Sequence, residues 1–272
     1  MIVALIDNGS LEPAAQLNLR AVAAALSKRT GVPVEAVSWK HSDRVPTDLL
    51  GGTPAWTLAP FVRAQIARGE REFVFVPFFI SAQGAIGSAL RGDLEKLQRE
   101  FETQNRFEFT FTSGLAAESA IADIVASRVR ETIALRGLVR PPVVLVDHGG
   151  PSPTSAALRD ALAEEVRTLL GVEIGLLAAA SMEGRHGPLL AEQLVVSNFA
   201  HGDIVVAPLF LSPGRHAGED GDVRQICRLA EAQSSALRCH LTGLVGTHPS
   251  AIEPLARALR ETLQNFHAHT LA

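Results

Sequence analysis

The sequence predicts an α/β protein made of two tandem copies of one open parallel-sheet domain, with helices on both faces of each sheet. Apolar runs rich in Val, Ile and Phe alternate with helix-length segments whose apolar residues recur at helical spacing. This alternation occurs twice along the chain, and two pairs of segments from the two halves align with equal offsets. At 272 residues the chain is long for one compact domain and suits two domains of about 130 residues each.

The expected strands are short apolar runs, each followed by a helical pattern. They occupy residues 2–6, 32–37, 73–77 and 107–112 in the first half and residues 143–146, 172–177, 204–207 and 237–241 in the second. Strands that alternate with helices form parallel sheets whose two faces are both covered by helices. The open parallel α/β class therefore follows for both halves.

The internal repeat is visible in two pairs of segments. VALIDNGSLEP at residues 3–13 aligns with VVLVDHGGPSP at residues 143–153, and FVFVPFFISAQGA at residues 73–85 aligns with IVVAPLFLSPGRH at residues 204–216. Asp, Gly and Pro recur at the same offsets in the first pair, and a Pro-x-Phe-aliphatic-Ser run recurs in the second. Matches of this kind indicate duplication of one structural unit.

The boundary between the halves is marked by the segment RGLVRPP at residues 136–142, which places Gly and two prolines between a helical pattern and a new strand. We therefore place the boundary near residue 138 and expect domains at residues 1–138 and 139–272. A duplicated homodimer would keep its two-fold interface within one chain. We accordingly expect the halves to pack around a pseudo-two-fold axis, so that a monomer is sufficient.

Composition and charge exclude several classes of partner. The formal net charge is −4 with no basic run, which argues against nucleic acid, since binding to phosphates requires clustered Lys and Arg. No apolar stretch approaches the roughly 20 residues that span a bilayer. The start, MIVALIDNGS, has no basic segment of a secretory signal, so we expect a cytoplasmic protein. Cys227 and Cys239 alone do not form a disulfide framework.

Two histidine-bearing motifs follow strands of the second half. The DHG motif around His148 follows its first expected strand, and the SPGRH segment that ends in His216 follows its third. Ligands of open parallel sheets bind beyond the carboxyl ends of the strands, where such loops gather. The aligned positions of the first half hold Asn8 and Ala85. Because both histidines are absent together from that copy, we predict that they share one site.

The two imidazoles favour metal chemistry. Neutral histidines hold borderline divalent ions such as iron, cobalt, nickel or zinc, and they also take up protons near neutral pH. Glu183 follows the second expected strand of the same half and is the best candidate for a companion carboxylate. His186 is nearby but has less support. Arg215, Arg185 and Arg224 lie close to the motifs in sequence and could supply cations for an acidic ligand.

The remaining histidines fit packing or surface roles better than ligand roles. They are His201, His240, His248, His267 and His269. In the first half, residues 39–46 and 51–56 form an insertion that the second half lacks, and long loops at the rim of an α/β sheet are often functional. This insertion holds both tryptophans and His41. It could form a wall of the site, although a structural role for His41 is the simpler interpretation.

These motifs resemble those of a known enzyme family. DHG after a first strand, and P-x-F-L-x-x-G-x-H followed four residues later by Asp220, resemble the signature segments of the sirohydrochlorin chelatases, which are class II chelatases. The resemblance covers residues 143–223, and the first half matches the same pattern in degraded form. The whole chain is thus similar to the long, fused members of the family, in which two halves form the equivalent of a dimer of the short form.

The resemblance implies ATP-independent insertion of ferrous iron into sirohydrochlorin to make sirohaem, with no cofactor beyond the substrate metal. It implies catalytic and metal-binding roles for His148, His216 and Glu183, and substrate-binding roles for Arg215, Arg185, Ser212 and Gly149. We expect long members to keep the active histidines in the first half, whereas this chain keeps them in the second. The working half is therefore assigned from the residues of this chain.

Three alternatives remain open at this point. Histidine and carboxylate ligands suit cobalt(II) as well as iron(II), so the chain could be a cobaltochelatase of cobalamin synthesis. A non-catalytic carrier of metal or tetrapyrrole could use the same side chains as ligands, and it would bind stoichiometrically without turnover. A nucleotide enzyme is disfavoured, because neither DNGS nor DHGG is a GxGxxG motif and no Walker A sequence occurs.

Overall fold

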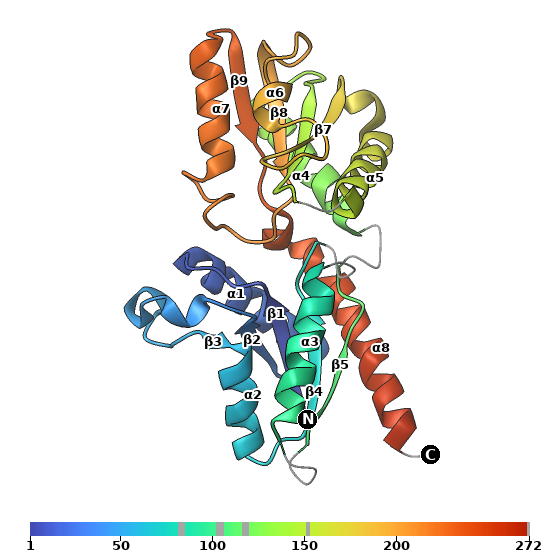
Figure 1. Cartoon of the computed structure of the whole chain (residues 1–272). Helices are drawn as coiled ribbons and strands as arrows, with labels where there is room; N and C mark the ends of the chain where they lie inside the picture. The colour runs from blue at the N-terminus through green and yellow to red at the C-terminus, as the bar shows by residue number, and fades with distance from the viewer. Residues whose placement is uncertain (81–84, 102–105, 116–119, 151–152, 271–272) are drawn as a thin grey trace. The chain divides into compact units, whose positions relative to one another are not determined.

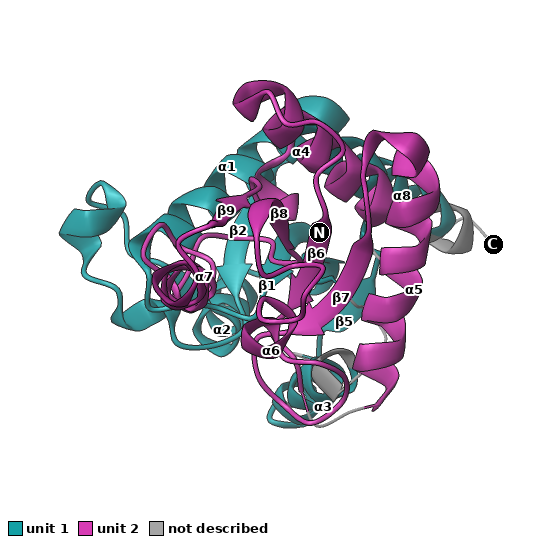
Figure 2. Cartoon of the chain, turned by 90° about the horizontal axis from the view of Figure 1, so that it is seen from above, with its two compact units in different colours: residues 1–118, 249–272 teal, residues 119–248 magenta. Residues whose placement is uncertain are grey.

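The computed structural model describes residues 1–80, 85–101, 106–115, 120–150 and 153–270, with the side chains of residues 85–87 and 266–270 left out. The chain forms two compact units. Unit 1 consists of Met1–Glu118 together with Pro249–Ala272, and unit 2 of Ser119–His248 (Figure 2). Each unit is built around its own parallel sheet, so the predicted α/β class with two parallel-sheet domains is confirmed.

Unit 1 contains a five-stranded parallel sheet in the order β3-β2-β1-β4-β5 (Figure 1). Its strands are β1 (Ile2–Asp7), β2 (Val34–Ser38), β3 (Trp56–Thr57), β4 (Glu72–Pro77) and β5 (Glu108–Phe111). Strands β1 and β4 are almost fully buried, as expected for central strands of a sheet covered on both faces. The short edge strand β3 was not predicted and begins at Trp56, the last residue of the insertion of the first half.

Helices cover both faces of this sheet. They are α1 (Pro13–Thr30), α2 (Leu58–Ala67), α3 (Ala85–Arg99) and α8 (Ile252–Thr270). Helices α2 and α3 bury Phe61 and Leu94 against Phe73 and Phe75 of β4 in one hydrophobic cluster. On the other side, α1 packs against β1, β2 and α8. Both faces of the sheet are therefore apolar, which explains why its strands are continuous hydrophobic runs.

Unit 2 repeats this plan with a four-stranded parallel sheet in the order β7-β6-β8-β9. Its strands are β6 (Val143–Asp147), β7 (Leu177–Ser181), β8 (Gly202–Pro208) and β9 (Leu237–Leu241), and its helices are α4 (Ala120–Arg136), α5 (Pro153–Leu170), α6 (Leu190–Gln193) and α7 (Asp222–Gln233). Helices α6 and α7 cover one face, where the free thiols of Cys227 and Cys239 are buried in the core. Helices α4 and α5 pack together and contact β8 and β7 respectively.

One predicted strand was wrong. Of the predicted residues 172–177, only Leu177 lies in a strand, because Gly171–Glu173 form a short 3₁₀ helix and Val172 is exposed. The strand is β7, Leu177–Ser181, with the sequence LAAAS. Its alanines carry little strand signal, and pairing with β6 fixes it in the sheet despite that low propensity. Glu183 still follows the second strand of this half, as the sequence indicated.

The last helix of each repeat lies in the unit formed by the other repeat. Helix α4, from the end of the first half, belongs to unit 2, and α8, from the end of the second half, belongs to unit 1. The predicted ranges 1–138 and 139–272 describe the two copies of the sequence repeat. The compact units differ from these ranges because each unit contains the residues that contact one another in the fold. Among the described residues, no helix is both long and apolar enough to cross a membrane.

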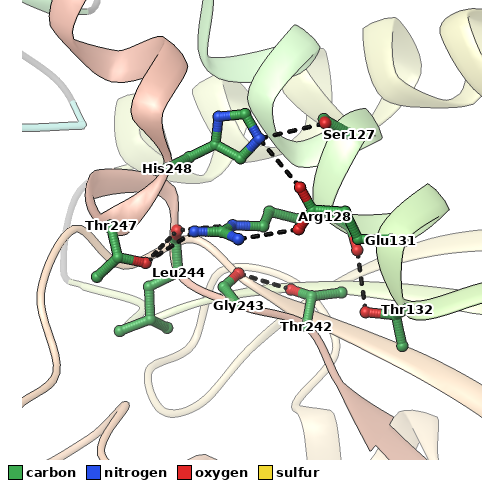
Figure 3. A network of polar contacts seen from close by, with 9 residues as sticks. All are labelled: Ser127, Arg128, Glu131, Thr132, Thr242, Gly243, Leu244, Thr247 and His248. Carbon is green, nitrogen blue, oxygen red and sulfur yellow. Dashed lines mark hydrogen bonds and ion pairs between the residues drawn. The ribbon is translucent and has the colours of Figure 1, made fainter. Parts of the chain in front are cut away.

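A polar network ties α4 to the segment that follows β9 (Figure 3). The guanidinium of Arg128 donates to the carbonyl of Leu244, to Thr247 Oγ1 and to Glu131 Oε2. His248 Nε2 lies 3.2 Å from Ser127 Oγ. Burial alone would raise the pKa of Glu131, but its bond from Arg128 and the nearby positive charge lower that pKa below its ordinary value. These contacts fix α4 on unit 2 as an ionic and hydrogen-bonded cluster.

Candidate functional site

The loop after β6 holds His148 against the loop after β7. Gly149 has a φ of +83°, and a Cβ added there would lie 1.8 Å from the carbonyl oxygen of Glu183. Only glycine permits this backbone conformation and this close approach. The amide of Glu183 in turn donates to the carbonyl of His148 at 3.1 Å. The two loops are thus joined through their backbones, which places the side chains of His148 and Glu183 side by side.

The loop after β8 brings His216 to the same place. The carbonyl of His216 accepts a hydrogen bond from the amide of Val223 at 3.1 Å, near the start of α7. A Cβ on Gly221 would come within 2.7 Å of that carbonyl, so glycine is required for the tight return of the chain. The imidazole rings of His148 and His216 have centroids 4.7 Å apart and meet edge to face. Two residues far apart in sequence therefore share one site.

The hydrogen bonds of the two histidines define their tautomers. His148 Nδ1 lies 2.9 Å from the carbonyl oxygen of Gly149, and His216 Nδ1 lies 2.6 Å from Asp222 Oδ2. A carbonyl and a carboxylate only accept hydrogen bonds, so Nδ1 carries the proton in each neutral ring. The lone pair of each ring is consequently on Nε2. Both imidazoles are prepared to bind a metal ion or to accept a proton through that atom.

Glu183 completes a group of potential ligands. Its Oε1 lies 3.6 Å from His148 Nε2, a separation that leaves the lone pair of that nitrogen available. The side chains of His148, His216 and Glu183 are 45%, 31% and 63% exposed, so a large substrate has access to them. In the part of the chain that the structure describes, no three His, Cys, Asp or Glu residues already form a metal-binding cluster. The three side chains are therefore accessible from solvent and do not form a closed metal site.

The predicted substrate-binding residues lie on the loops that carry these three side chains. Arg215 adjoins His216, is 81% exposed and has its Nε 4.0 Å from Asp222 Oδ2. Arg185 is exposed on the same loop as Glu183, and Ser212 is half-buried on the loop after β8. Arg224 is half-buried within the first turn of α7. Arg215 and Arg185 therefore offer positive charge at the edge of the histidine site.

Asp222 is a site residue that sequence reasoning missed. The motif comparison pointed to Asp220, four residues after His216, but the structure pairs Asp220 Oδ1 with Arg228 Nη1 at 3.0 Å. Asp222, the first residue of α7, is the carboxylate that binds His216. Asp220 and Asp222 are both acidic and both close to His216 in sequence, so the sequence alone does not distinguish them. The path of the loop backbone decides which of the two carboxylates reaches the imidazole.

The equivalent loops of the first half have the same backbone and different side chains. Gly9 has a φ of +88°, and its added Cβ would lie 1.7 Å from the carbonyl oxygen of Lys40, while the amide of Lys40 donates to the carbonyl of Asn8. Asn8 therefore stands where unit 2 has His148, and Lys40 stands where it has Glu183. A lysine cation replaces a potential metal ligand. The aligned residue Ala85 lies outside the residues whose side chains are described.

Within unit 2, His201, His240 and His248 belong to parts of the fold other than the loops of His148, Glu183 and His216. His240 pairs with Asp203 at 2.7 Å and, with His201, lines a cavity of about 610 Å³ beside the segment at residues 136–142. His248 belongs to the α4 network. His41 in unit 1 has a φ of +72° and accepts a hydrogen bond at Nδ1 from Arg44. His267 and His269 lie outside the residues whose side chains are described.

Three solved structures have a similar fold over nearly the whole chain. SirB from Bacillus subtilis with Fe³⁺ is 16% identical with a TM-score of 0.70 and 98% of both chains covered. The sirohydrochlorin chelatase SirB from Bacillus subtilis subspecies spizizenii in complex with cobalt is 14% identical with a TM-score of 0.70 and 97% of both chains covered. CbiX, the terminal enzyme for siroheme biosynthesis in denitrifying bacteria, is 13% identical with a TM-score of 0.63, covering 96% of this chain and 97% of that one.

No curated protein sequence matches the chain significantly. The CbiX family model, in contrast, matches it twice in succession, at residues 2–132 and at residues 142–262. The two matches cover most of the chain and coincide with the two copies of the sequence repeat. The predicted tandem duplication and the predicted sirohydrochlorin chelatase resemblance are thereby confirmed, and the chain belongs to the CbiX family.

Proposed function

We propose that this chain is a class II chelatase, a lyase that inserts a divalent metal ion into sirohydrochlorin, with ferrous iron as the first candidate. The observation that carries the proposal is the paired orientation of His148 and His216. Each ring has its Nδ1 engaged by an acceptor, which leaves the lone pair of the neutral ring on Nε2, and the two ring centroids are 4.7 Å apart. Glu183 adds a carboxylate beside them.

The chemistry needs a base and a weak metal site in the same place. Two pyrrole N–H protons leave the macrocycle as one divalent ion enters, so the charge of the macrocycle with its metal is conserved. The free Nε2 atoms can bind the incoming ion or accept those protons. The open arrangement with an exposed Glu183 favours release of the ion to the macrocycle. Asp222 would stabilise the protonated form of His216 through its bond to Nδ1.

The substrate carries eight carboxylates, and the loops around the histidines offer groups that bind them. Arg215 and Arg185 are the exposed cations beside His216 and Glu183, and guanidinium groups match carboxylates in a bidentate geometry. Ser212 lies on the loop of Arg215 after β8, and Gly149 lies on the loop of His148 after β6, so the Ser212 hydroxyl and the Gly149 amide are further hydrogen-bond donors for the substrate. We therefore assign these four residues to substrate binding.

The proposed reaction uses no ATP and no cofactor other than the substrate metal. The expected partners are sirohydrochlorin and the metal ion, with no nucleic acid or membrane. We propose that a monomer carries the activity, because one chain already holds both copies of the family repeat. We also propose a cytoplasmic location for the chain.

Cobalt is the second candidate metal. Imidazole and carboxylate ligands accept iron(II) and cobalt(II) alike, and the two SirB structures with this fold are described with Fe³⁺ and with cobalt.

Incubation of the purified chain with sirohydrochlorin and each divalent metal in turn, followed by absorbance of the macrocycle, tests the proposal. Many turnovers per chain with iron support a ferrochelatase, and faster turnover with cobalt supports a cobaltochelatase. Binding of one equivalent with no turnover would instead identify a carrier and contradict the proposal.

A further inference from the structure

A buried arginine lies directly behind the histidine site. Arg159 on α5 is 2% exposed, although it carries a full positive charge. Its Nε and Nη2 atoms donate to Asp160 Oδ1 at 2.9 and 2.7 Å. A buried charge is costly unless it is paired and hydrogen-bonded. The remaining contacts of this guanidinium therefore need a structural or functional explanation.

Those contacts join three segments that form the site. Nη1 of Arg159 donates to Ser181 Oγ at the end of β7 and to the carbonyl of His186 at 3.2 Å, and it lies 3.8 Å from Asp147 Oδ1 at the end of β6. Ser181 Oγ in turn donates to Asp147 Oδ1 at 2.7 Å. Gly187 packs so tightly that an added Cβ would lie 2.6 Å from the guanidinium. One side chain thus binds the end of β6, the end of β7 and the loop at residues 182–188.

The first repeat builds the same connection with a neutral residue. Ser38 Oγ donates to Asp7 Oδ1 at 2.7 Å, as Ser181 does to Asp147. Gln16 on α1 donates to Ser38 Oγ at 2.6 Å and to Ser42 Oγ, in the loop after β2, at 2.8 Å. Gln16 aligns with Ala156, three residues before Arg159, so the first repeat makes this connection from a point about one turn earlier on its helix. In the first repeat, which lacks the histidines, the corresponding group is uncharged.

We propose that Arg159 is a positioning residue, which holds the loop of Glu183 against the loop of His148 so that their side chains face one metal ion. This inference rests on the proposed function, because it concerns the same site. Arg159 is buried and acts through Asp147, Ser181 and the carbonyl of His186, without contact to the metal. Groups that orient metal ligands in this way typically contribute 10–100-fold to metal affinity.

Arg159→Gln tests this inference, because glutamine keeps a hydrogen-bonding amide but has no charge and a shorter side chain. Glutamine can keep the bond to Ser181 and cannot also span to the carbonyl of His186. We expect the variant to fold, to show faster hydrogen exchange at residues 182–188, and to bind Co²⁺ alone about 10–100-fold more weakly than wild type. Arg159→Lys, with one donor group on a long stem, should recover part of that affinity.

Arg167→Gln is the matched control, because Arg167 lies on the same helix, is exposed and pairs only with Glu164 among the contacts of the described residues. It should leave both the exchange of residues 182–188 and the Co²⁺ affinity unchanged. Circular dichroism confirms that all variants are folded at the temperature of the measurements. Titration with Co²⁺ needs no sirohydrochlorin, so it reports on the site apart from catalysis.

The outcomes separate this inference from the proposed function. If wild type binds Co²⁺ but never metallates sirohydrochlorin, the proposed catalysis is wrong, and the loss of Co²⁺ affinity in Arg159→Gln still supports the positioning role. Unchanged Co²⁺ affinity in Arg159→Gln overturns the inference, even if exchange of the loop rises, since Arg159 would then be merely structural. Failure of wild type to bind Co²⁺ at all would overturn both.

Discussion

Two equivalent aspartates show how a single neighbouring residue changes the environment of a buried carboxyl. Asp7 ends β1 and is 9% exposed, and burial raises its pKa from 3.8 to about 6, although bonds from Ser38 and the amide of Gly9 act in the opposite direction. Asp147 ends β6 and has the guanidinium of Arg159 within 3.8 Å. The first repeat therefore holds a carboxyl that resists ionisation, whereas the second provides an ionic partner.

This difference predicts the effect of Asp7→Asn on stability. The folded-state pKa of Asp7 lies above its unfolded value, so wild type loses stability as the pH rises from about 4 to about 6. The asparagine variant avoids this loss and should be more stable by up to about 3 kcal/mol at pH 8, and by about half as much at pH 5. Urea unfolding at the two pH values measures both gains.

Asp147→Asn is the matched control for that experiment. Its carboxylate has an arginine partner, and removal of the charge would leave a buried guanidinium less well compensated. We expect this variant to lose stability at pH 8. A gain for Asp147→Asn, or equal stability of Asp7→Asn and wild type at pH 8, would contradict the account of the two environments.

Asp222 provides a prediction about catalysis. Its carboxylate fixes the Nδ1 proton of His216, so Asp222→Asn should lower turnover in metal insertion by about 10–100-fold while the fold persists. Asp220→Asn is the control, because Asp220 pairs with Arg228 and should retain wild-type turnover. Initial rates with sirohydrochlorin measure both effects. A larger loss of turnover for Asp220→Asn than for Asp222→Asn would contradict this assignment and indicate that Asp220, the residue in the motif, supports the histidine site.

At the scale of elements, the exchange of the last helices is the feature with the clearest consequence for folding. Helix α8 comes from the end of the second repeat and packs on α1 in unit 1. The strands of unit 1 all lie before residue 112, so its sheet is covered by a helix synthesised more than 100 residues later. Unit 1 cannot complete its core until the end of the chain is available.

Leu259→Ala tests this dependence. Leu259 is fully buried on α8, and loss of a buried leucine costs about 2–5 kcal/mol. We expect hydrogen exchange to accelerate in α1 and β1 of unit 1 and to stay unchanged in β6 of unit 2. The exposed Gln264 on the same helix provides the control variant Gln264→Ala. Faster exchange confined to unit 2 would show that α8 stabilises its own repeat instead.

The elements also show which parts of the fold are predictable from sequence. Strands such as β4 and β6 are runs of large apolar residues. Because both faces of such a strand are buried, the sequence shows a continuous apolar run that predicts the strand. The alanine-rich β7 has no such signature and is determined by its pairing with β6. The helix exchange is equally hidden, because the burial pattern of an amphipathic helix does not say which sheet it covers.

For the whole molecule, duplication and divergence explain the distribution of the candidate chemistry. Both repeats keep the glycine that brings the first two loops together, Gly9 and Gly149, each at positive φ. Only the second repeat combines these loops with His148 and Glu183, while the first has Asn8 and Lys40. Comparison of the repeats predicted the two histidines. It did not reveal Asp222 or Arg159, because their roles depend on hydrogen bonds across loops that no local pattern records.

The most direct test of the account is the initial rate of metal insertion into sirohydrochlorin by wild type and by three variants. His148→Ala and His216→Ala should each abolish most turnover, because either change removes one of the two Nε2 lone pairs, and the fold should persist because both residues lie on loops outside the buried core. Asn8→Ala in the first repeat should have a mild effect. Near-normal rates for both histidine variants would contradict the assignment of the site to the second repeat.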